Sequence, residues 1–381
     1  MKKIFKYMDK PLLIITVALF VFGLVMVFSA SNVTAYMSHA VSPYNYFIKQ
    51  AIFLIGGLIL SMIIIRFNTR SYGFFSWTLL ILVTISLVLL LIIGKAKNRA
   101  LSWFDLGFIS VQPSEFIKVI SIVFLACYYD TNQKKLNSWT KSLFPIGICL
   151  LIAILIFLQP DLGTTIIFCC IVGTIFLSVP ISKEIKYKIT FATLGFIFFG
   201  IVAIVGSGKG ILLERQLERL NFSNPCSRIL EDGNQVCNCY IAINNGGLTG
   251  VGLGNSTQKY LYLPEPYTDF IYAIIVEELG VITGVILILL YIFIIYRILL
   301  IGRRSPNNRG AVICYGVAMY IFLHVAVNLM GIMGIMPMTG VPLPFMSYGG
   351  SFTICLIAAL TLVQRVSFEN EVMKEKRKKN A

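Results

Sequence analysis

The chain has 381 residues, of which 57% are hydrophobic and only 13% are charged, and its formal net charge is +15. Soluble domains carry about 25% charged residues, and the apolar residues here fall into blocks of about 20, the length that crosses a bilayer core. The composition therefore predicts an all-α polytopic membrane protein and excludes an ordinary soluble fold.

Ten apolar ranges are predicted to be transmembrane helices, all within a single transmembrane domain that covers residues 1–381. The first follows four lysines and lacks a small-x-small cleavage site, so we expect a retained helix rather than a removed signal peptide. In chain order the ranges are 11–31, 46–65, 74–93, 113–129, 142–158, 162–180, 188–206, 267–296, 311–334 and 350–364.

The distribution of lysine and arginine predicts the orientation of these helices. With the N-terminus inside, 22 of the 32 basic residues fall in inside segments and ten in outside segments. Because cytoplasmic loops are enriched in Lys and Arg, both termini are expected in the cytoplasm, and 365–381 is expected to be a basic cytoplasmic tail. The charge then serves topology and attraction to anionic membrane lipids, so we expect no nucleic-acid partner.

Residues 206–266 form the one long extracytoplasmic loop of the predicted topology. A short helix is expected on the membrane surface at 212–220, where Arg215 and Arg219 could hold a phosphate or pair with neighbouring glutamates. Cys226 could form a disulfide bond with Cys237 or with Cys239 in an oxidising compartment, and the sequence leaves this choice open. The two histidines are far apart in sequence, so no metal-ligand cluster is predicted.

Three polar or irregular segments are expected at the same outer face. In Gln112–Lys118, the side chains of Glu115 and Lys118 share a helix face, as a local ion pair or as an anion site. In Gln159–Thr165, Asp161 could cap the next helix, but a second Gln-Pro turn with an acid at the same face favours more than a pure cap. The run 335–351 is too apolar for a solvated loop and too rich in Pro and Gly for a helix, so it is expected to be buried or to line a cavity.

The fourth outer segment, 244–280, combines glycines with acidic residues. Asp269 is predicted in the first turn of the eighth span, where the helix dipole favours the ionised carboxylate that a general base requires. Glu277 and Glu278 lie deeper and are expected to be paired, protonated or in a wet cavity, more as structural than as catalytic groups. Together the four segments predict an extracytoplasmic site built at helix mouths, with the glycines as a lid or turn beside the acid.

These motifs resemble the SEDS family (shape, elongation, division and sporulation). The resemblance runs nearly end to end, and the segment from Gly254 to Lys259 favours the division branch over the elongation branch. The matching motifs are Phe28–Ser31, Gln112–Lys118, Gln159–Thr164, Gly250–Gly280 and Gly340–Ser351.

The resemblance implies a ten-helix fold and an inverting glycosyltransferase that polymerises lipid II into glycan strands. The family's catalytic acid falls on Asp269, the proposed base for the acceptor hydroxyl. Tyr267 stands where the family has histidine; because a tyrosine does not titrate near neutral pH, we expect it to position the loop. Candidate contacts to lipid II or its diphosphate are Glu115, Lys118, Asp161, Arg215, Arg219, Gln258, Lys259, Glu265, Tyr267, Thr268 and Ser347.

The resemblance also bears on the cofactors, partners and location of the protein. No cofactor is required by the sequence, although a divalent cation, Mg²⁺ or Mn²⁺, is compatible with a diphosphate leaving group. The expected partners are a class B penicillin-binding protein and other division proteins, at the septum of the bacterial cytoplasmic membrane. The alternatives are a lipid II flippase that uses Glu277, Glu278 and His324 as a proton relay, an elongation-type polymerase, and a non-enzymatic scaffold.

Overall fold

A computed structural model describes residues 2–39, 41–93, 102–105, 107, 110–206, 225–228, 233–260 and 262–380. The α-helices are α1 (Lys2–Tyr7), α2 (Lys10–His39), α3 (Asn45–Ile64), α4 (Tyr72–Ile93), α5 (Pro113–Thr131), α6 (Trp139–Phe157), α7 (Leu162–Ser178), α8 (Lys183–Gly206), α10 (Gly233–Gly246), α11 (Ile271–Arg303), α12 (Asn308–Ile332) and α13 (Gly350–Asn380). Short 3-10 helices are η1 (Thr69–Ser71), η2 (Gln133–Lys135) and η3 (Pro225–Arg228). Strand β1 (Phe104–Asp105) pairs antiparallel with β2 (Ser110–Val111).

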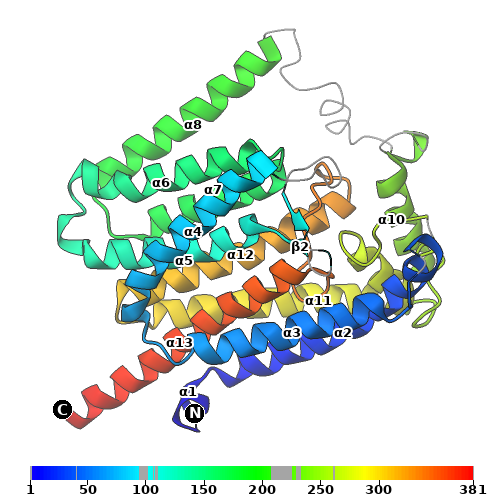
Figure 1. Ribbon diagram of the computed structural model, residues 1–381, viewed down its shortest axis with the longest axis horizontal. Coiled ribbons are helices and arrows are strands. Elements are labelled where there is room, and N and C mark those ends of the chain that lie inside the picture. Colours follow the sequence, from blue (N-terminus) through cyan, green and yellow to red (C-terminus); the bar gives the residue numbers. More distant parts are fainter. Residues whose placement is uncertain are drawn as a thin grey trace.

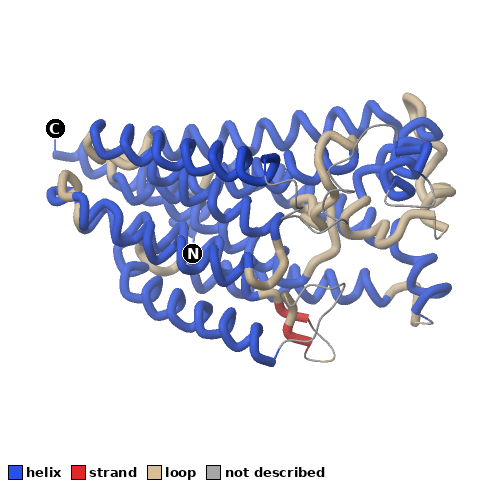
Figure 2. Tube along the Cα trace, turned by 90° about the horizontal axis from the view of Figure 1, so that it is seen from above, coloured by secondary structure: helices blue, strands red, loops and turns tan. Residues whose placement is uncertain are grey.

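The helices form an elongated bundle with its two chain ends at the same end (Figure 1). The opposite end holds α10, β2 and most of the irregular loops, as the view from above shows (Figure 2). Helix α12 packs against α5, α7, α11 and α13, so it lies in the buried centre. Helix α8 slants away from the bundle (Figure 1).

The all-α membrane fold predicted from composition is confirmed. Each of the ten predicted ranges overlaps one helix, namely α2 to α8 and α11 to α13. Among the described residues, seven helical segments are long and apolar enough to cross a membrane, and α7 is a shorter apolar helix. The number ten therefore stays a prediction.

The long outer segment is more structured than predicted. It contains α10, which packs against α11 and carries Cys237 in a disulfide bond to Cys226 of η3, while Cys239 is a free buried thiol. The predicted surface helix at 212–220, with Arg215 and Arg219, lies outside the described residues.

Helix α11 is broken at Gly280, whose φ of 85° and ψ of 164° are not helical. The break frees the carbonyls of Glu277 and Glu278, which accept hydrogen bonds from the amides of Val251 (3.0 Å) and Gly252 (2.9 Å). On the other side of the break, the amide of Val281 donates to the carbonyl of residue 247 at 2.9 Å. The glycine-rich loop therefore replaces the hydrogen bonds that the helix loses.

The close approach of these two backbones explains two of the glycines. A Cβ atom added to Gly250 would lie 2.3 Å from the carbonyl oxygen of Glu278, and one added to Gly280 would lie 2.2 Å from that of Leu248. Both residues also have positive φ, which favours glycine. The glycine-rich loop turns here, as predicted, and packs against the break in α11; its place beside Asp269 stays a prediction.

Candidate active site

The four outer segments meet, as predicted from the topology. The backbone amide of Gln112 donates to Ser351 Oγ at 3.0 Å, and the Gln112 side chain reaches Asp161 Oδ2 at 3.4 Å. The backbone amide of Tyr348 donates to the carbonyl of Tyr267 at 2.9 Å. Residues 112–118, 159–165, 244–278 and 337–351 thus form one connected region at the loop-rich end of the bundle (Figure 2).

Asp269 lies in a turn just before α11, whose N-cap is Phe270. Its predicted place in the first helical turn is therefore wrong, because the helix begins at Ile271. The carbonyls of three successive residues are held from outside the turn. The backbone amide of Tyr348 donates to the carbonyl of Tyr267. Ser347 Oγ donates to the carbonyl of Thr268 at 2.6 Å, and Asn328 Nδ2 donates to the carbonyl of Asp269 at 2.9 Å. This clamp fixes the backbone beneath the acid.

Burial raises the pKa of Asp269 to about 7, and the nearby negative charge of Glu265 adds to the effect. The predicted stabilisation of the ionised form by the helix dipole is thus outweighed by desolvation. The side chain is nevertheless only partly buried. Gly340 has a φ of 67°, and a Cβ added to it would lie 3.5 Å from Asp269 Oδ2, so glycine leaves space beside the carboxyl group.

The ring of Tyr267 is buried between two other tyrosines. Its centroid lies 4.4 Å from that of Tyr46 and 5.8 Å from that of Tyr348. Burial raises the pKa of Tyr267 above its ordinary value, with a further contribution from Glu265. The phenol therefore stays protonated at neutral pH, in agreement with the expectation that it does not titrate there.

Glu115 and Lys118 form the local ion pair that their spacing predicts. Lys118 Nζ donates to Glu115 Oε1 at 2.7 Å and lies 3.0 Å from Nε2 of His324, and all three side chains are buried. His324 Nδ1 lies 2.8 Å from the carbonyl oxygen of Tyr320. These contacts join α5 to α12 and leave the lysine fully engaged.

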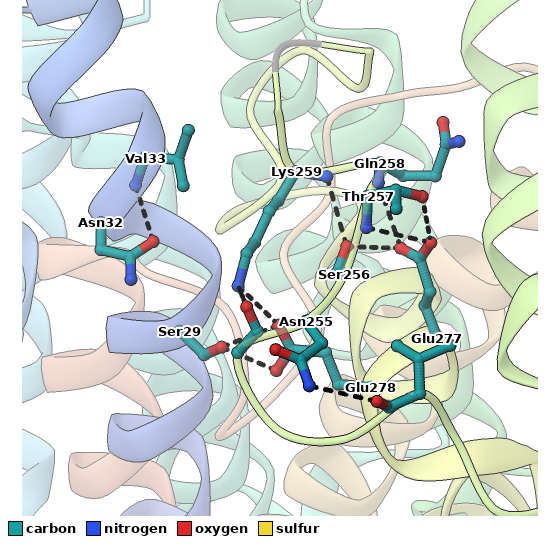
Figure 3. A network of polar contacts seen from close by, with 12 residues as sticks. Ser29, Asn32, Val33, Asn255, Ser256, Thr257, Gln258, Lys259, Glu277 and Glu278 are labelled. Carbon is teal, nitrogen blue, oxygen red and sulfur yellow. Dashed lines mark hydrogen bonds and ion pairs between the residues drawn. The ribbon is translucent and has the colours of Figure 1, made fainter.

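Glu278 is ion-paired, one of the three outcomes predicted for these acids, whereas Glu277 is held by neutral hydrogen-bond donors; together they organise the loop at 254–259 (Figure 3). Glu277 accepts hydrogen bonds from the hydroxyls of Ser256 and Thr257, from the backbone amides of Thr257 and Gln258, and from Asn245.

Glu278 completes the same network through two charged or polar partners. It accepts from Ser29 of α2 at 2.6 Å and from Lys259 at 2.9 Å, and both members of the ion pair are at most 1% exposed. Lys259 Nζ also donates to the carbonyl of Gly254 at 2.6 Å. The predicted diphosphate contact at Lys259 is therefore not free in this arrangement: its ammonium group anchors the loop to α11.

The remaining predicted residues hold the backbone or lie near Asp269. Asp161 caps α7 by accepting from the amide of Thr164 at 3.0 Å, the simpler of the two roles considered for it, and its contact with substrate stays a prediction. The hydroxyl of Ser347 donates to the carbonyl of Thr268 in the clamp. Gln258 is buried, and its backbone amide donates to the carboxylate of Glu277. Glu265 is exposed and Thr268 is partly exposed, so both candidates are accessible to a ligand.

Sequence reasoning did not single out Asn328, which joins two elements of the site. Its side-chain amide donates both to the carbonyl of Asp269 and, at 2.9 Å, to that of Val341. An amide inside an otherwise apolar span was the available signal, because such groups need partners in a membrane. Ser29 was noted only as part of a motif, and its bond to Glu278 gives that motif a structural reason.

Within the described part of the chain, no group of three or more His, Cys, Asp or Glu side chains could hold a metal ion. A Mg²⁺ ion needs only one or two protein carboxylates when substrate phosphates supply further ligands. Exposed Glu265, beside Asp269, is compatible with such a role.

Two curated proteins are similar to this chain in sequence over nearly its whole length. The probable peptidoglycan glycosyltransferase FtsW of Bacillus subtilis is 35% identical, covering 100% of this chain and 95% of the relative. Stage V sporulation protein E of the same organism is 34% identical, covering 94% of this chain and 96% of the relative.

Two solved structures share the fold. One comes from work on a peptidoglycan synthase complex (TM-score 0.75, 24% identity, 94% of this chain and 97% of the other), and the other is RodA of Thermus thermophilus (TM-score 0.66, 24% identity, 94% and 96%). A sequence model of the FtsW/RodA/SpoVE family, described as cell cycle protein, matches residues 10–372. The chain therefore belongs to the FtsW/RodA/SpoVE family.

Proposed function

We propose that this chain is a peptidoglycan glycosyltransferase that polymerises lipid II into glycan strands at the outer face of the cytoplasmic membrane during cell division. The names of its relatives support the activity, since several are called peptidoglycan glycosyltransferase FtsW. The observation that carries the proposal is Asp269, a partly accessible carboxyl group with a pKa of about 7 on a clamped turn.

In this proposal Asp269 is the general base. Its carboxylate removes the proton from the 4-hydroxyl of the acceptor sugar as that oxygen attacks the anomeric carbon of the donor. The bond to the undecaprenyl diphosphate breaks on the opposite face, so the configuration inverts. A base with a pKa near the working pH is efficient because it is ionised often enough and still holds the proton well.

The leaving diphosphate needs positive charge, and the two described lysines of the candidate set are already engaged. Lys118 is paired with Glu115, and Lys259 is paired with Glu278. We therefore assign this role to Arg215 and Arg219, or to a divalent cation carried by the diphosphate with Glu265 as a protein ligand. A bound Mg²⁺ or Mn²⁺ would neutralise the charge that develops on the leaving group.

The expected partners and location belong to the same proposal. A class B penicillin-binding protein would cross-link the strands, and other division proteins would recruit the pair to the septum. The likeness to a structure from a peptidoglycan synthase complex supports such a partnership at the level of the fold. Both termini would face the cytoplasm, in keeping with their shared end of the bundle (Figure 1) and the excess of basic residues there.

Asp269→Asn tests the proposal with purified protein and lipid II. The variant should fold normally and form no glycan polymer on a gel, whereas Asp105→Asn, which changes an exposed outer acid in β1, should polymerise normally. Polymer made by Asp269→Asn at the wild-type rate would refute the assignment. Translocation of lipid II by a wild-type protein that forms no polymer would instead favour the flippase.

A further inference from the structure

A cavity of about 890 Å³ lies at the end of the bundle that carries both chain termini. It is bounded by η1 and the start of α4, the end of α5, the start of α12 and the outer part of α13. Asp269 lies at the other end of α11, whose last residue, Arg303, precedes the cavity residue Asn307 by a few positions. The cavity is therefore distinct from the candidate active site.

The lining of the cavity is positively charged. It holds four basic side chains and two acidic ones, which gives a net charge of two positive: Arg70, Arg309, Arg365 and Lys376 against Asp130 and Glu369. Arg309 is ion-paired with Asp130, and Arg365 with Glu369 at 3.0 Å. Within the described residues, neither Arg70 nor Lys376 forms an ion pair, so their charges are available to a ligand.

Two further observations point to an anionic ligand. The Arg309 side chain lines the cavity and is 14% exposed. Arg309 also lies in the first turn of α12, where the N-cap residue Asn307 provides no side-chain hydrogen bond. The amides of an uncapped helix N-terminus, together with a neighbouring guanidinium group, favour a phosphate group.

Apolar side chains also line the cavity, on the same helix as Arg365, Glu369 and Lys376. Phe368, Val372 and Met373 line it along α13, below the last buried turns of that helix. A cavity lined by both cations and apolar side chains fits a ligand that carries a phosphate on an apolar body. Basic pockets between transmembrane helices at the cytoplasmic side bind the headgroups of anionic lipids in this way.

We propose that this cavity binds the phosphate headgroup of an anionic phospholipid from the inner leaflet, with Arg70, Arg309 and Lys376 as its cationic contacts. The bound lipid would join η1, α12 and α13; η1 and α13 are already joined by the hydrogen bonds from Thr69 to Glu369. The proposal needs the orientation with both termini inside, but it does not depend on the glycosyltransferase activity.

The test compares two charge-matched variants of the full chain. Arg70→Gln/Lys376→Gln removes two cavity charges, whereas Lys378→Gln/Lys379→Gln removes two exposed charges further along α13 that do not line the cavity. A short-chain phosphatidylglycerol is titrated in a zwitterionic detergent, and bound lipid is counted by native mass spectrometry. Short-chain phosphatidylcholine, glycerol 3-phosphate and inorganic phosphate are titrated in parallel.

We expect saturable binding of phosphatidylglycerol to the wild-type protein and no comparable binding of phosphatidylcholine. The cavity variant should bind about 30-fold more weakly, which equals about 2 kcal/mol, while the tail variant should bind as the wild type does. Val372→Trp keeps every charge but fills the cavity, so it should also weaken binding.

Three results would overturn the proposal. Equal losses in the cavity and tail variants would mean that general surface charge attracts the lipid. Binding of inorganic phosphate or glycerol 3-phosphate as tight as that of the lipid would identify a soluble ligand instead. Unchanged binding by Val372→Trp in a protein that still folds would place the lipid elsewhere.

Discussion

Replacing Lys259 by Met should destabilise this protein far more than the loss of an ordinary lysine. The change removes the ammonium group that pairs with Glu278 at 2.9 Å, at a place where the two side chains are 1% and 0% exposed. The carboxylate would keep Ser29 as a hydrogen-bond donor but would lose its compensating charge. Removing one partner of a buried pair costs about 3–5 kcal/mol, because an uncompensated charge stays buried.

The chain offers a matched control in Lys188→Met. Lys188 and Glu184 form an ion pair of similar length, 2.6 Å, but their side chains are 60% and 72% exposed. Water already solvates both charges there, so the control should leave the free energy of unfolding unchanged within error. The comparison isolates burial as the cause.

The measurement is the free energy of unfolding in detergent micelles, followed by tryptophan fluorescence during denaturant titration. In the double variant Lys259→Met/Glu278→Gln the buried charge is gone as well, so the stability should recover by at least about 1 kcal/mol relative to Lys259→Met. A loss in Lys259→Met no larger than that in Lys188→Met would refute the claim that this pair anchors the loop of Figure 3.

Three further outcomes follow from the site. Since the pKa of Asp269 is about 7, polymerisation should rise with pH through about 7 as the base form accumulates, and Glu265→Gln should move this rise to lower pH; an unchanged profile would contradict the coupling. Gly254 has a φ of 85° and open space around it, so Gly254→Ala should lower the free energy of unfolding by about 1–2 kcal/mol. Gly250→Ala should lower it more, because the added Cβ would overlap the backbone of α11; equal decreases in the thermal unfolding temperature of the two variants would contradict this. Asn328→Leu should lower kcat about tenfold or more, since small displacements of catalytic groups have such effects, with KM little changed; a change in KM alone would point to substrate binding.

The helices and the meeting of the four outer segments were predictable because their signals are local. Apolar length predicts a span, and the positions of lysine and arginine predict which helix ends share a side. These two inferences place Gln112 and Asp161 at one face, and their side chains are in contact. The sequence pattern alone singled out Asp269, the family resemblance supported that choice, and the residue lies on the clamped turn.

What could not be predicted depends on contacts between distant residues. A glycine in an apolar run gives no sign that a helix breaks, and the break at Gly280 exists only with the loop at 247–252 packed against it. The chain that follows this loop carries Lys259, which pairs with Glu278. A lysine predicted to contact the diphosphate of the substrate is therefore buried inside the protein. The raised pKa of Asp269 could not be predicted for a related reason: the helix dipole follows from the sequence, whereas burial requires the fold.

The hydrogen bond between Ser29 and Glu278 joins residues 249 positions apart. At about 5–20 residues per second, a ribosome needs about 12–50 s to add that length of chain. Helix α2 therefore spends this time in the membrane before the acid that binds it has been made. A nascent chain that ends before Gly280 could insert its helices as far as α8, but the loop that follows α10 would have no broken helix to pack against, so the outer region is among the last parts of the molecule to assemble.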